Sequence, residues 1–362
     1  MKKLLPLILF FFIVPIYATS YTDLYVDTDV GDDGNDCTSV GVDNACASLS
    51  GAVAKLEEND EDVTIHCKGA AADTTAVTIS LTHMDGTHTL TIQTDAADRF
   101  PGKWSTDHYR LVSSSAYVIT INYGFLNIDG LQIDGTYEAG AIPHVIHIDL
   151  DPSFNPALVQ ISNFMLKKSA HRSDAGEEIG IIWIADGSVT NGVLNIWNGV
   201  IYDLTNGHAN TSGIWNAEGD VTANIYNMTF HNNQRAVVRG GGTVNIVNGL
   251  FDNNAADAAG TVSDTYCITT NDNTKGLNGA GAGNQFEKTF VFEDDDNEDF
   301  HLDATDTDAI DQGITNPGSG LFLDDVDGTA RAGYAPWDVG ADEEESTPVS
   351  TRGGDILLLG VG

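Results

Sequence analysis

Leu-Asn-Ile-Asp-Gly-Leu-Gln-Ile-Asp at 126–134 is the stretch that decides the fold, because the chain repeats it. Related stretches occupy 159–167, 194–202, 223–231 and 244–252. The third position is always isoleucine, and the positions two before it and five after it are apolar. The isoleucines are Ile128, Ile161, Ile196, Ile225 and Ile246. Apolar residues at alternate positions predict a strand with one buried face.

Each repeat also carries polar residues at fixed positions. The position before the isoleucine is an amide: Asn127, Gln160, Asn195, Asn224 or Asn245. Two positions after the isoleucine stands a residue that tolerates left-handed backbone, namely Gly130, Asn163, Asn198, Asn227 or Asn248. This order predicts a strand, a tight bend and a second short strand.

The spacing of the repeats indicates how they assemble. Successive isoleucines are 33, 35, 29 and 21 residues apart, and a weaker sixth copy is expected at Ile268. Repeats of this length bury their apolar face by stacking on one another. The unequal spacing indicates loops of different length between fixed strands. The sequence therefore predicts an all-β chain wound into a parallel β-solenoid.

The chain ends and the flanking segments complete the predicted organisation. Lys2 and Lys3 followed by an apolar run predict a signal peptide over 1–18, and hence a secreted or cell-surface protein. The apolar run is shorter than the roughly 20 residues that span a bilayer, so no transmembrane anchor is expected. The remaining divisions are an N-terminal strand, acidic loop and capping helix (19–60), the coils (61–290), a C-terminal capping segment (291–343) and a flexible tail (344–362).

A short helix is predicted near the N-terminus. Leu49, Val53 and Leu56 are apolar at helical spacing, with Ser48 or Ser50 as a possible N-cap. A helix at this place would cover the open end of the solenoid, where strand edges are otherwise unpaired.

The charge of the chain limits its partners. The formal net charge is −37 over 362 residues. Such a surface repels phosphates, so nucleic acid and anionic lipid are poor partners. Solubility outside the cell is the simplest account of the charge.

The cysteines suggest one disulfide. Cys37 and Cys46 are nine residues apart in a loop-like stretch, and in an exported protein such a pair is expected to close a small loop. Cys67 and Cys267 are expected to be buried free thiols.

Three segments together resemble bacterial secreted proteins of the right-handed parallel β-helix, pectin-lyase-like superfamily. The first is the strand, acidic loop and helix start at 25–49, and the second is the set of repeats, whose bend asparagines would stack into a hydrogen-bonded ladder. The third includes Ala-Ile-Asp-Gln-Gly at 309–313, Asp-Val-Asp-Gly-Thr-Ala-Arg at 325–331 and Trp-Asp-Val-Gly-Ala-Asp-Glu at 337–343. The resemblance covers 24–343 and implies the right-handed parallel β-helix and export. It does not fix the function, because this scaffold carries lyases, hydrolases, adhesins and phage tailspikes.

The predicted location of a binding site is the column of side chains six residues after each isoleucine. Its members are Asp134, Lys167, Tyr202, His231 and Asp252, and the alternation predicts that they point outward. The few basic residues of the chain concentrate nearby, which favours an anionic glycan as ligand, and tryptophans there could stack on sugar rings. The predicted substrate-binding residues are Lys167, His171, Arg172, Trp197, Tyr202, His231 and Arg235. Taken singly, each has a plainer interpretation, as a surface ion pair, an ordinary histidine or an aromatic side chain packed under a loop.

Two classes of function remain open. The favoured hypothesis is a secreted or cell-surface protein, monomeric or homotrimeric, that binds a polysaccharide or serves as a structural or adhesive module. The alternative is a polysaccharide lyase or glycoside hydrolase acting on acidic glycans. In a lyase, Lys167 or Arg235 would be the base, flanked by Asp203 and Asp252.

Calcium is a further hypothesis, in a structural role. Oxygen donors cluster at Asp29, Asp32 and Asp33 and again at Asp325 and Asp327, as hard cations prefer. Neither stretch has the full spacing of an EF-hand loop, and Asx-rich turns account for both.

Overall fold

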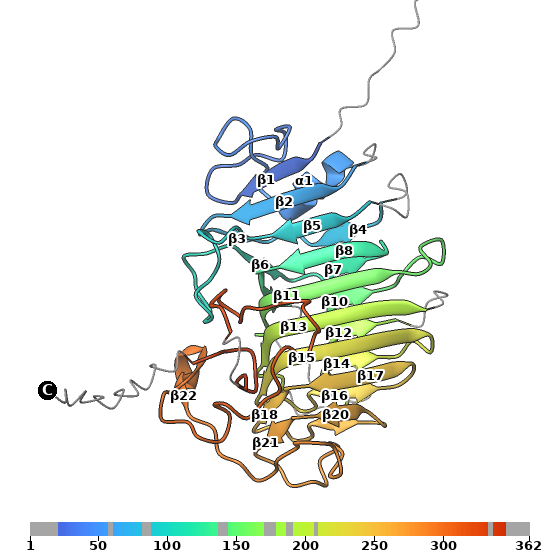
Figure 1. Ribbon diagram of the computed structural model, residues 1–362. Coiled ribbons are helices and arrows are strands. Elements are labelled where there is room, and N and C mark those ends of the chain that lie inside the picture. Colours follow the sequence, from blue (N-terminus) through green and yellow to red (C-terminus); the bar gives the residue numbers. More distant parts are fainter. Residues whose placement is uncertain are drawn as a thin grey trace, which may run out of the picture.

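Parallel strands stacked coil upon coil form the body of the molecule (Figure 1). The structure is a computed structural model and describes residues 21–56, 61–81, 88–136, 144–169, 179–185, 191–205, 209–331 and 336–344. Each complete coil contributes a strand to sheet A, bends, continues in a second short strand, and then crosses to sheet B. This arrangement confirms the predicted all-β parallel β-helix.

Sheet A carries the repeats. Its main path is β1 (Asp23–Asp27), β2 (Val63–Lys68), β5 (Leu90–Gln93), β8 (Phe125–Asp129), β11 (Leu158–Lys167), β13 (Gly192–Tyr202), β15 (Val221–His231), β17 (Thr243–Val247) and β20 (Ser263–Thr265). Past the bend, the ladder continues through β3 (Ala72–Asp73), β6 (Arg110–Ser113), β9 (Gln132–Gly135), the second halves of β11, β13 and β15, β18 (Leu250–Asp252) and β21 (Ile268–Thr269).

Sheet B closes the coils on the opposite side. It consists of β4 (Val77–Ile79), β7 (Tyr117–Ile121), β10 (His144–Ile148), β12 (Ile179–Ile184), β14 (Thr211–Asn216), β16 (Val237–Arg239) and β19 (Ala258–Ala259). Its outer face carries a column of stacked rings. The His144 ring lies 5.5 Å from Tyr117 and 4.8 Å from Trp183, and Trp183 lies 5.2 Å from Trp215.

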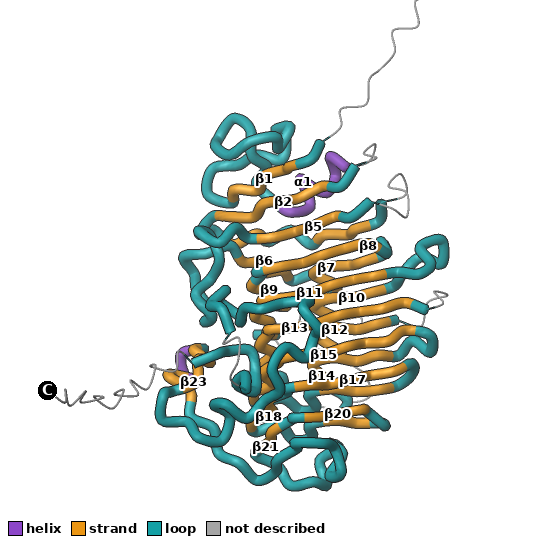
Figure 2. Tube along the Cα trace, in the orientation of Figure 1, coloured by secondary structure: helices purple, strands orange, loops and turns teal. Residues whose placement is uncertain are grey.

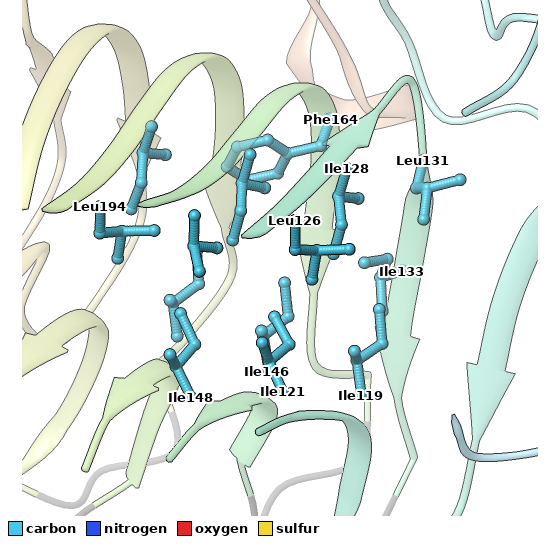
Figure 3. Close-up of a cluster of buried hydrophobic side chains, with 14 of the residues drawn as sticks. Ile119, Ile121, Leu126, Ile128, Leu131, Ile133, Ile146, Ile148, Phe164 and Leu194 are labelled. Atoms are coloured by element: carbon cyan, nitrogen blue, oxygen red, sulfur yellow. The ribbon is translucent and has the colours of Figure 1, made fainter. Parts of the chain in front are cut away.

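The core fills the space between the two sheets. Figure 3 shows side chains from both sheets pointing toward one another, among them Ile128 of sheet A and Ile146 of sheet B. The five predicted isoleucines are paired in register from β8 to β17 and are at most 1% exposed. Stacking therefore buries one isoleucine per repeat, as the pattern predicted.

The bends behave as their residue types require. Gly130 has φ +79°, and Asn163, Asn198, Asn227 and Asn248 have φ between +47° and +56°. These four asparagines are called the bend column. The amide of Asn198 donates to Asn163 at 3.0 Å, and that of Asn248 donates to Asn227 at 3.0 Å. The predicted ladder thus exists in two pairs.

The predicted sixth copy is wrong in its alignment. Ile246 pairs with Asp264 on β20, so Asp264 occupies the sixth position of the isoleucine column. Ile268 instead pairs with Leu250, beyond the bend. Both residues are buried, and the shorter coil explains why spacing alone placed the wrong residue in the column.

The N-terminal end is built as expected. Helix α1 (Leu49–Val53) begins after Ser48, whose hydroxyl accepts from the backbone N–H of Gly51 at 3.0 Å, and a 3₁₀ turn (Ala54–Leu56) follows. Leu49, Val53 and Leu56 are buried, and α1 lies beside β1 and β2 at the end of the stack (Figure 1). The predicted disulfide between Cys37 and Cys46 is present, and Cys67 and Cys267 are buried free thiols.

The chain does not end at the last coil but returns along the side of the stack. Residues 290–331 and 336–344, here called the C-terminal arm, run mostly as loop back to the level of β11 (Figures 1 and 2). The arm contains β22 (Phe292–Asp294), a 3₁₀ turn (Asp295–Asn297) and β23 (Asp299–Leu302), with β22 antiparallel to β23. The segment expected to cap the helix therefore covers its flank. None of the described helices is long and apolar enough to cross a membrane.

Candidate functional site

The predicted outward column is in register but is not open to solvent. In the strand register, Lys167 lies between Asp134 and Tyr202, and the column continues through His231 to Asp252. The C-terminal arm covers it, so that Tyr202 is 0% exposed and His231 is 9% exposed. The alternation correctly gave the direction of these side chains, but the expectation of an exposed binding surface is wrong because another part of the chain lies on them.

Phe300 of β23 is the arm residue that seals this column. Its ring lies 4.8 Å from Tyr202 and 5.2 Å from His231. The imidazole of His231 is also 2.8 Å from a carboxylate oxygen of Asp252. Burial raises the pKa of Tyr202 far above its ordinary value. These groups form packed structure between coil and arm.

Lys167 is held in place by two partners. Its ammonium lies 2.6 Å from the carboxylate of Glu298 and 4.0 Å from the ring centre of Trp104. The side chain is 15% exposed. A base must lie within hydrogen-bond reach of its substrate, so the position of Lys167 against the arm argues against it as the catalytic base of a lyase. His171 and Arg172 lie outside the described residues.

The other predicted catalytic residues lie in different surroundings. Asp252 is buried under the arm, Asp203 is exposed after β13 and accepts from the amide of Asn232 at 2.7 Å, and Arg235 is half-buried before β16. Within the described residues, neither Lys167 nor Arg235 forms an ion pair with Asp203 or Asp252. The catalytic roles of these residues stay a prediction.

The first predicted calcium stretch is engaged in turns. The carboxylate of Asp29 accepts from the backbone N–H groups of Ala70 and Ala71, which lower its pKa. Asp32 accepts from the N–H of Gly34. Asp33 accepts from both the N–H and the hydroxyl of Ser48. These carboxylates serve separate parts of the loop and do not converge on one point.

The second stretch lines an acidic pocket of about 350 Å³ in the arm. Burial raises the pKa of Asp325 to about 9. Burial opposes the protonation of His301, but the hydrogen bond to Asp327 and the charges of Asp342 and Asp299 raise its pKa to about 10. The positive charge of protonated His301 balances the carboxylates of this pocket, as a bound cation would. No group of three or more His, Cys, Asp or Glu in the described ranges is arranged to hold a metal ion, and calcium stays a prediction.

An open groove of about 610 Å³ lies elsewhere, between sheet A and the tip of the arm. One wall consists of arm residues 320–324. The sheet contributes Thr91, Asn127, Asp129, Gln160, Ser162, Asn163 and Trp197.

Part of the polar surface of this groove comes from two of the amides that precede the isoleucines, Asn127 and Gln160. Thr91, Asn127 and Gln160 are paired in register on β5, β8 and β11. The row continues through Asn195, Asn224 and Asn245. Together the five amides are called the outer amide row. They point away from the core because they alternate with buried residues on each strand.

Aromatic packing fixes the arm against the groove. Trp197 is 8% exposed and stacks on Phe322 of the arm, with ring centres 5.7 Å apart and planes at 11°. The amide of Asn198 donates to the backbone carbonyl of Asp324 at 2.8 Å. Trp197, a predicted sugar-binding residue, therefore lies at the groove but is largely packed under the arm.

Two carboxylates face the groove from opposite sides. Asp129 on β8 is paired with Arg99 and accepts from the hydroxyl of Ser162 and the amide of Asn163, each at 2.7 Å. No other described residue donates to the carboxylate of Asp324 on the arm, and burial together with the charge of Asp129 raises its pKa.

The repeated amide was the signal in the sequence for this groove. It marks an outward row that differs from the column six residues after each isoleucine. The arm wall had no such signal, because residues 320–324 show no period and reach sheet A across more than a hundred residues of chain.

Comparisons with known proteins were made by sequence and by structure. No family model matches the sequence, and no curated protein is similar to it in sequence. The crystal structure of pectate lyase Pel9A is similar over 90% of this chain and 97% of that chain, with 11% sequence identity and a TM-score of 0.34. A similarity at this level bears on neither activity nor substrate.

Proposed function

We propose that this protein is a secreted or cell-surface β-helix that binds a glycan in the groove between sheet A and the arm. The observation that carries the proposal is the row of amides, with Asn127 and Gln160 in register in an open groove of about 610 Å³. An amide offers both donors and an acceptor, which match sugar hydroxyls. Neighbouring strands are about 4.8 Å apart, so the row presents similar groups at regular intervals to a polymer of repeated units.

The apolar wall and the disulfide support the same proposal. Leu323 is 62% exposed at the rim of the groove and is available to pack on the apolar face of a sugar ring. Phe322 lines the wall beside it. The Cys37–Cys46 disulfide is of the kind that persists in oxidising compartments, in agreement with the signal peptide predicted from the sequence.

The test is binding of purified protein to a glycan array, followed by calorimetry with the best oligosaccharide. The double variant Asn127→Ala with Gln160→Ala should weaken binding about 10- to 30-fold, since each lost neutral hydrogen bond costs about 1 kcal/mol. Asn245→Ala is the matched control, because Asn245 belongs to the same row but does not line the groove. Equal loss in both variants, or no binding to any glycan, would contradict the proposal.

Hydrolysis of the bound glycan is a second candidate, favoured by the unlike environments of Asp324 and Asp129. Asp324, with its raised pKa, would give its proton to the glycosidic oxygen as that C–O bond breaks. Asp129 would take a proton from the water that attacks the anomeric carbon. Two carboxyls in such different settings are the usual division into acid and base.

Reducing ends released from neutral and uronic glycans test this second candidate. Asp324→Asn should abolish their release and leave binding within about threefold. Absorbance of an unsaturated product that survives Asp324→Asn and disappears in Lys167→Ala would instead support a lyase. Absence of turnover with binding retained leaves the protein as a binding module.

A further inference from the structure

Among the residues that the structure describes, each charged side chain lining the groove is a carboxylate. Asp129 lies on the sheet and Asp324 on the arm, and no described lysine, arginine or histidine is among the lining residues. The remaining polar groups are amides and hydroxyls, which carry no charge. The surface presented to a ligand is therefore neutral to negative.

The arginines nearest to these carboxylates lie behind the surface. Arg99 is paired with Asp129, and its side chain is 13% exposed. Arg331, whose side chain is 0% exposed, donates to the backbone carbonyl of Asp324 and to the carboxylate of Glu343. Neither is placed to meet an anionic sugar in the groove, because Arg99 is largely buried and paired with Asp129, and the Arg331 side chain is fully buried.

The long-range field acts in the same direction. The chain has 53 acidic and 16 basic residues. A surface with this balance attracts cations and repels polyanions over about a Debye length, which is near 10 Å at 0.1 M salt. A uronic polymer would approach the groove against both the local and the overall charge.

We propose that the groove prefers a glycan bearing protonated amines, that is, an amino-sugar polymer, over neutral or uronic chains. This inference rests on the proposed function of the groove and names its ligand class. An ammonium group is a donor without an acceptor, so it suits the carboxylates of Asp129 and Asp324. The amide oxygens of Asn127 and Gln160 supply further acceptors for ammonium and hydroxyl groups.

The experiment compares three oligosaccharides of equal length with the purified protein by calorimetry. They are β-1,4-linked glucosamine, its N-acetylated counterpart, and a β-1,4-linked uronate, at pH 6 in 20 mM and 500 mM NaCl. We expect the amine form to bind about fivefold more tightly than the acetylated form at low salt, since an exposed ion pair contributes up to about 1 kcal/mol. High salt should reduce this preference to less than twofold.

Asp324→Asn removes one carboxylate with little change in shape and should halve the preference for the amine form or reduce it further. Asp272→Asn is the matched control: it changes the net charge of the chain equally at an exposed turn outside the groove. Thermal unfolding of each variant checks folding, and the salt dependence of the unaltered protein tests the inference if Asp324→Asn does not fold.

The outcomes separate the two proposals. Equal binding of the amine and acetylated forms, or tighter binding of the uronate, overturns the inference while the groove remains a glycan site. A preference that Asp272→Asn reduces as much as Asp324→Asn assigns the effect to overall charge and also overturns it. Absence of binding to all three chains, together with a negative glycan array, overturns the proposed function itself.

Discussion

Two columns of asparagine run along the same coils, three residues apart, with nearly equal hydrogen bonds. In the bend column, Asn248 donates to Asn227 at 3.0 Å. In the outer amide row, Asn245 donates to Asn224 at 2.9 Å. The two columns differ in backbone and burial: Asn227 and Asn248 are 0% exposed with positive φ, whereas Asn224 and Asn245 are half-buried on ordinary strand.

Hydrogen-bond length alone therefore does not distinguish an asparagine that stabilises the fold from one that is available to a ligand. Bend-column amides also hold the arm, because Asn198 donates to the carbonyl of Asp324 and Asn248 exchanges hydrogen bonds with Ile314. Outer-row amides retain exposed surface for a ligand. The bend column should therefore govern stability, and the outer row should govern binding.

The largest effect is expected for Asn198→Ala. The substitution removes the bond to Asn163, leaves the carbonyl of Asp324 without its amide donor, and places alanine at φ +49°. Lost buried hydrogen bonds and left-handed strain together should lower the free energy of unfolding by about 3 to 5 kcal/mol. Urea denaturation measures this, with Asn195→Ala, on the same strand, as the control. Similar losses in both variants would remove the distinction between the columns.

Low pH provides a second comparison, because the ring column of sheet B contains a histidine that can become charged. On sheet B, burial lowers the pKa of His144 to about 4. The unfolded chain binds this proton near pH 6.5 and the folded chain only near pH 4, so the contribution to stability is lost as pH falls between these values. At 1.36 kcal/mol per pKa unit, the loss is about 3 kcal/mol.

The pH effect must be measured as a difference, because other groups oppose it. Burial raises the pKa of Asp338 to about 7 and of Asp342 to about 6, and such carboxyls add stability as pH falls. The stability of the unaltered protein minus that of His144→Phe, measured at pH 7 and pH 4, isolates the histidine. A difference that stays constant with pH would show that His144 titrates normally.

A smaller effect is expected for Asn198→Gly. Glycine adopts positive φ without strain, so only the side-chain hydrogen bonds are lost. The expected loss is about 1 to 2 kcal/mol, and the gap between glycine and alanine measures the backbone cost of the bend. If both substitutions cost the same in denaturation, the bend is not what selects asparagine at this position.

The smallest effect is expected for Asn224→Ala in the outer row. It removes bonds to Asn195 and Asn245 at a position that water can reach. Such surface changes usually alter stability by about 0.5 kcal/mol or less. Asn227→Ala on the same strand is the matched buried control. A loss above about 2 kcal/mol for Asn224→Ala would make the outer row structural as well.

Much of the coil could be predicted from sequence, because strand alternation and bend residues are local signals. The register of Ile128 with Ile161, the positive φ of Asn198 and the cap at Ser48 all follow from residue type and period. The burial of Tyr202 under the arm does not follow from residue type or period. Its contact with Phe300 joins segments far apart in the chain, and periodicity reveals which side chains point outward but not what comes to lie on them.

The candidate site was missed for the same reason. Asn127 and Gln160 were visible as a repeated amide, yet nothing in the sequence showed that residues 320–324 would form the facing wall. Lys167 was predicted to bind substrate because the chain has few basic residues, but its charge is paired with Glu298.

The return of the arm has a consequence for cooperativity. In a simple stack each coil touches only its neighbours, so coils can unzip from either end. Here Lys103 is bonded to Asp299, Asn248 to Ile314 and Thr229 to Ala341, so one late segment spans many early coils. A coil that carries one of these contacts would break its bond to that segment on opening. Since the arm ties distant coils to one another, we expect the stack to unfold as one unit where a simple stack could melt piecemeal.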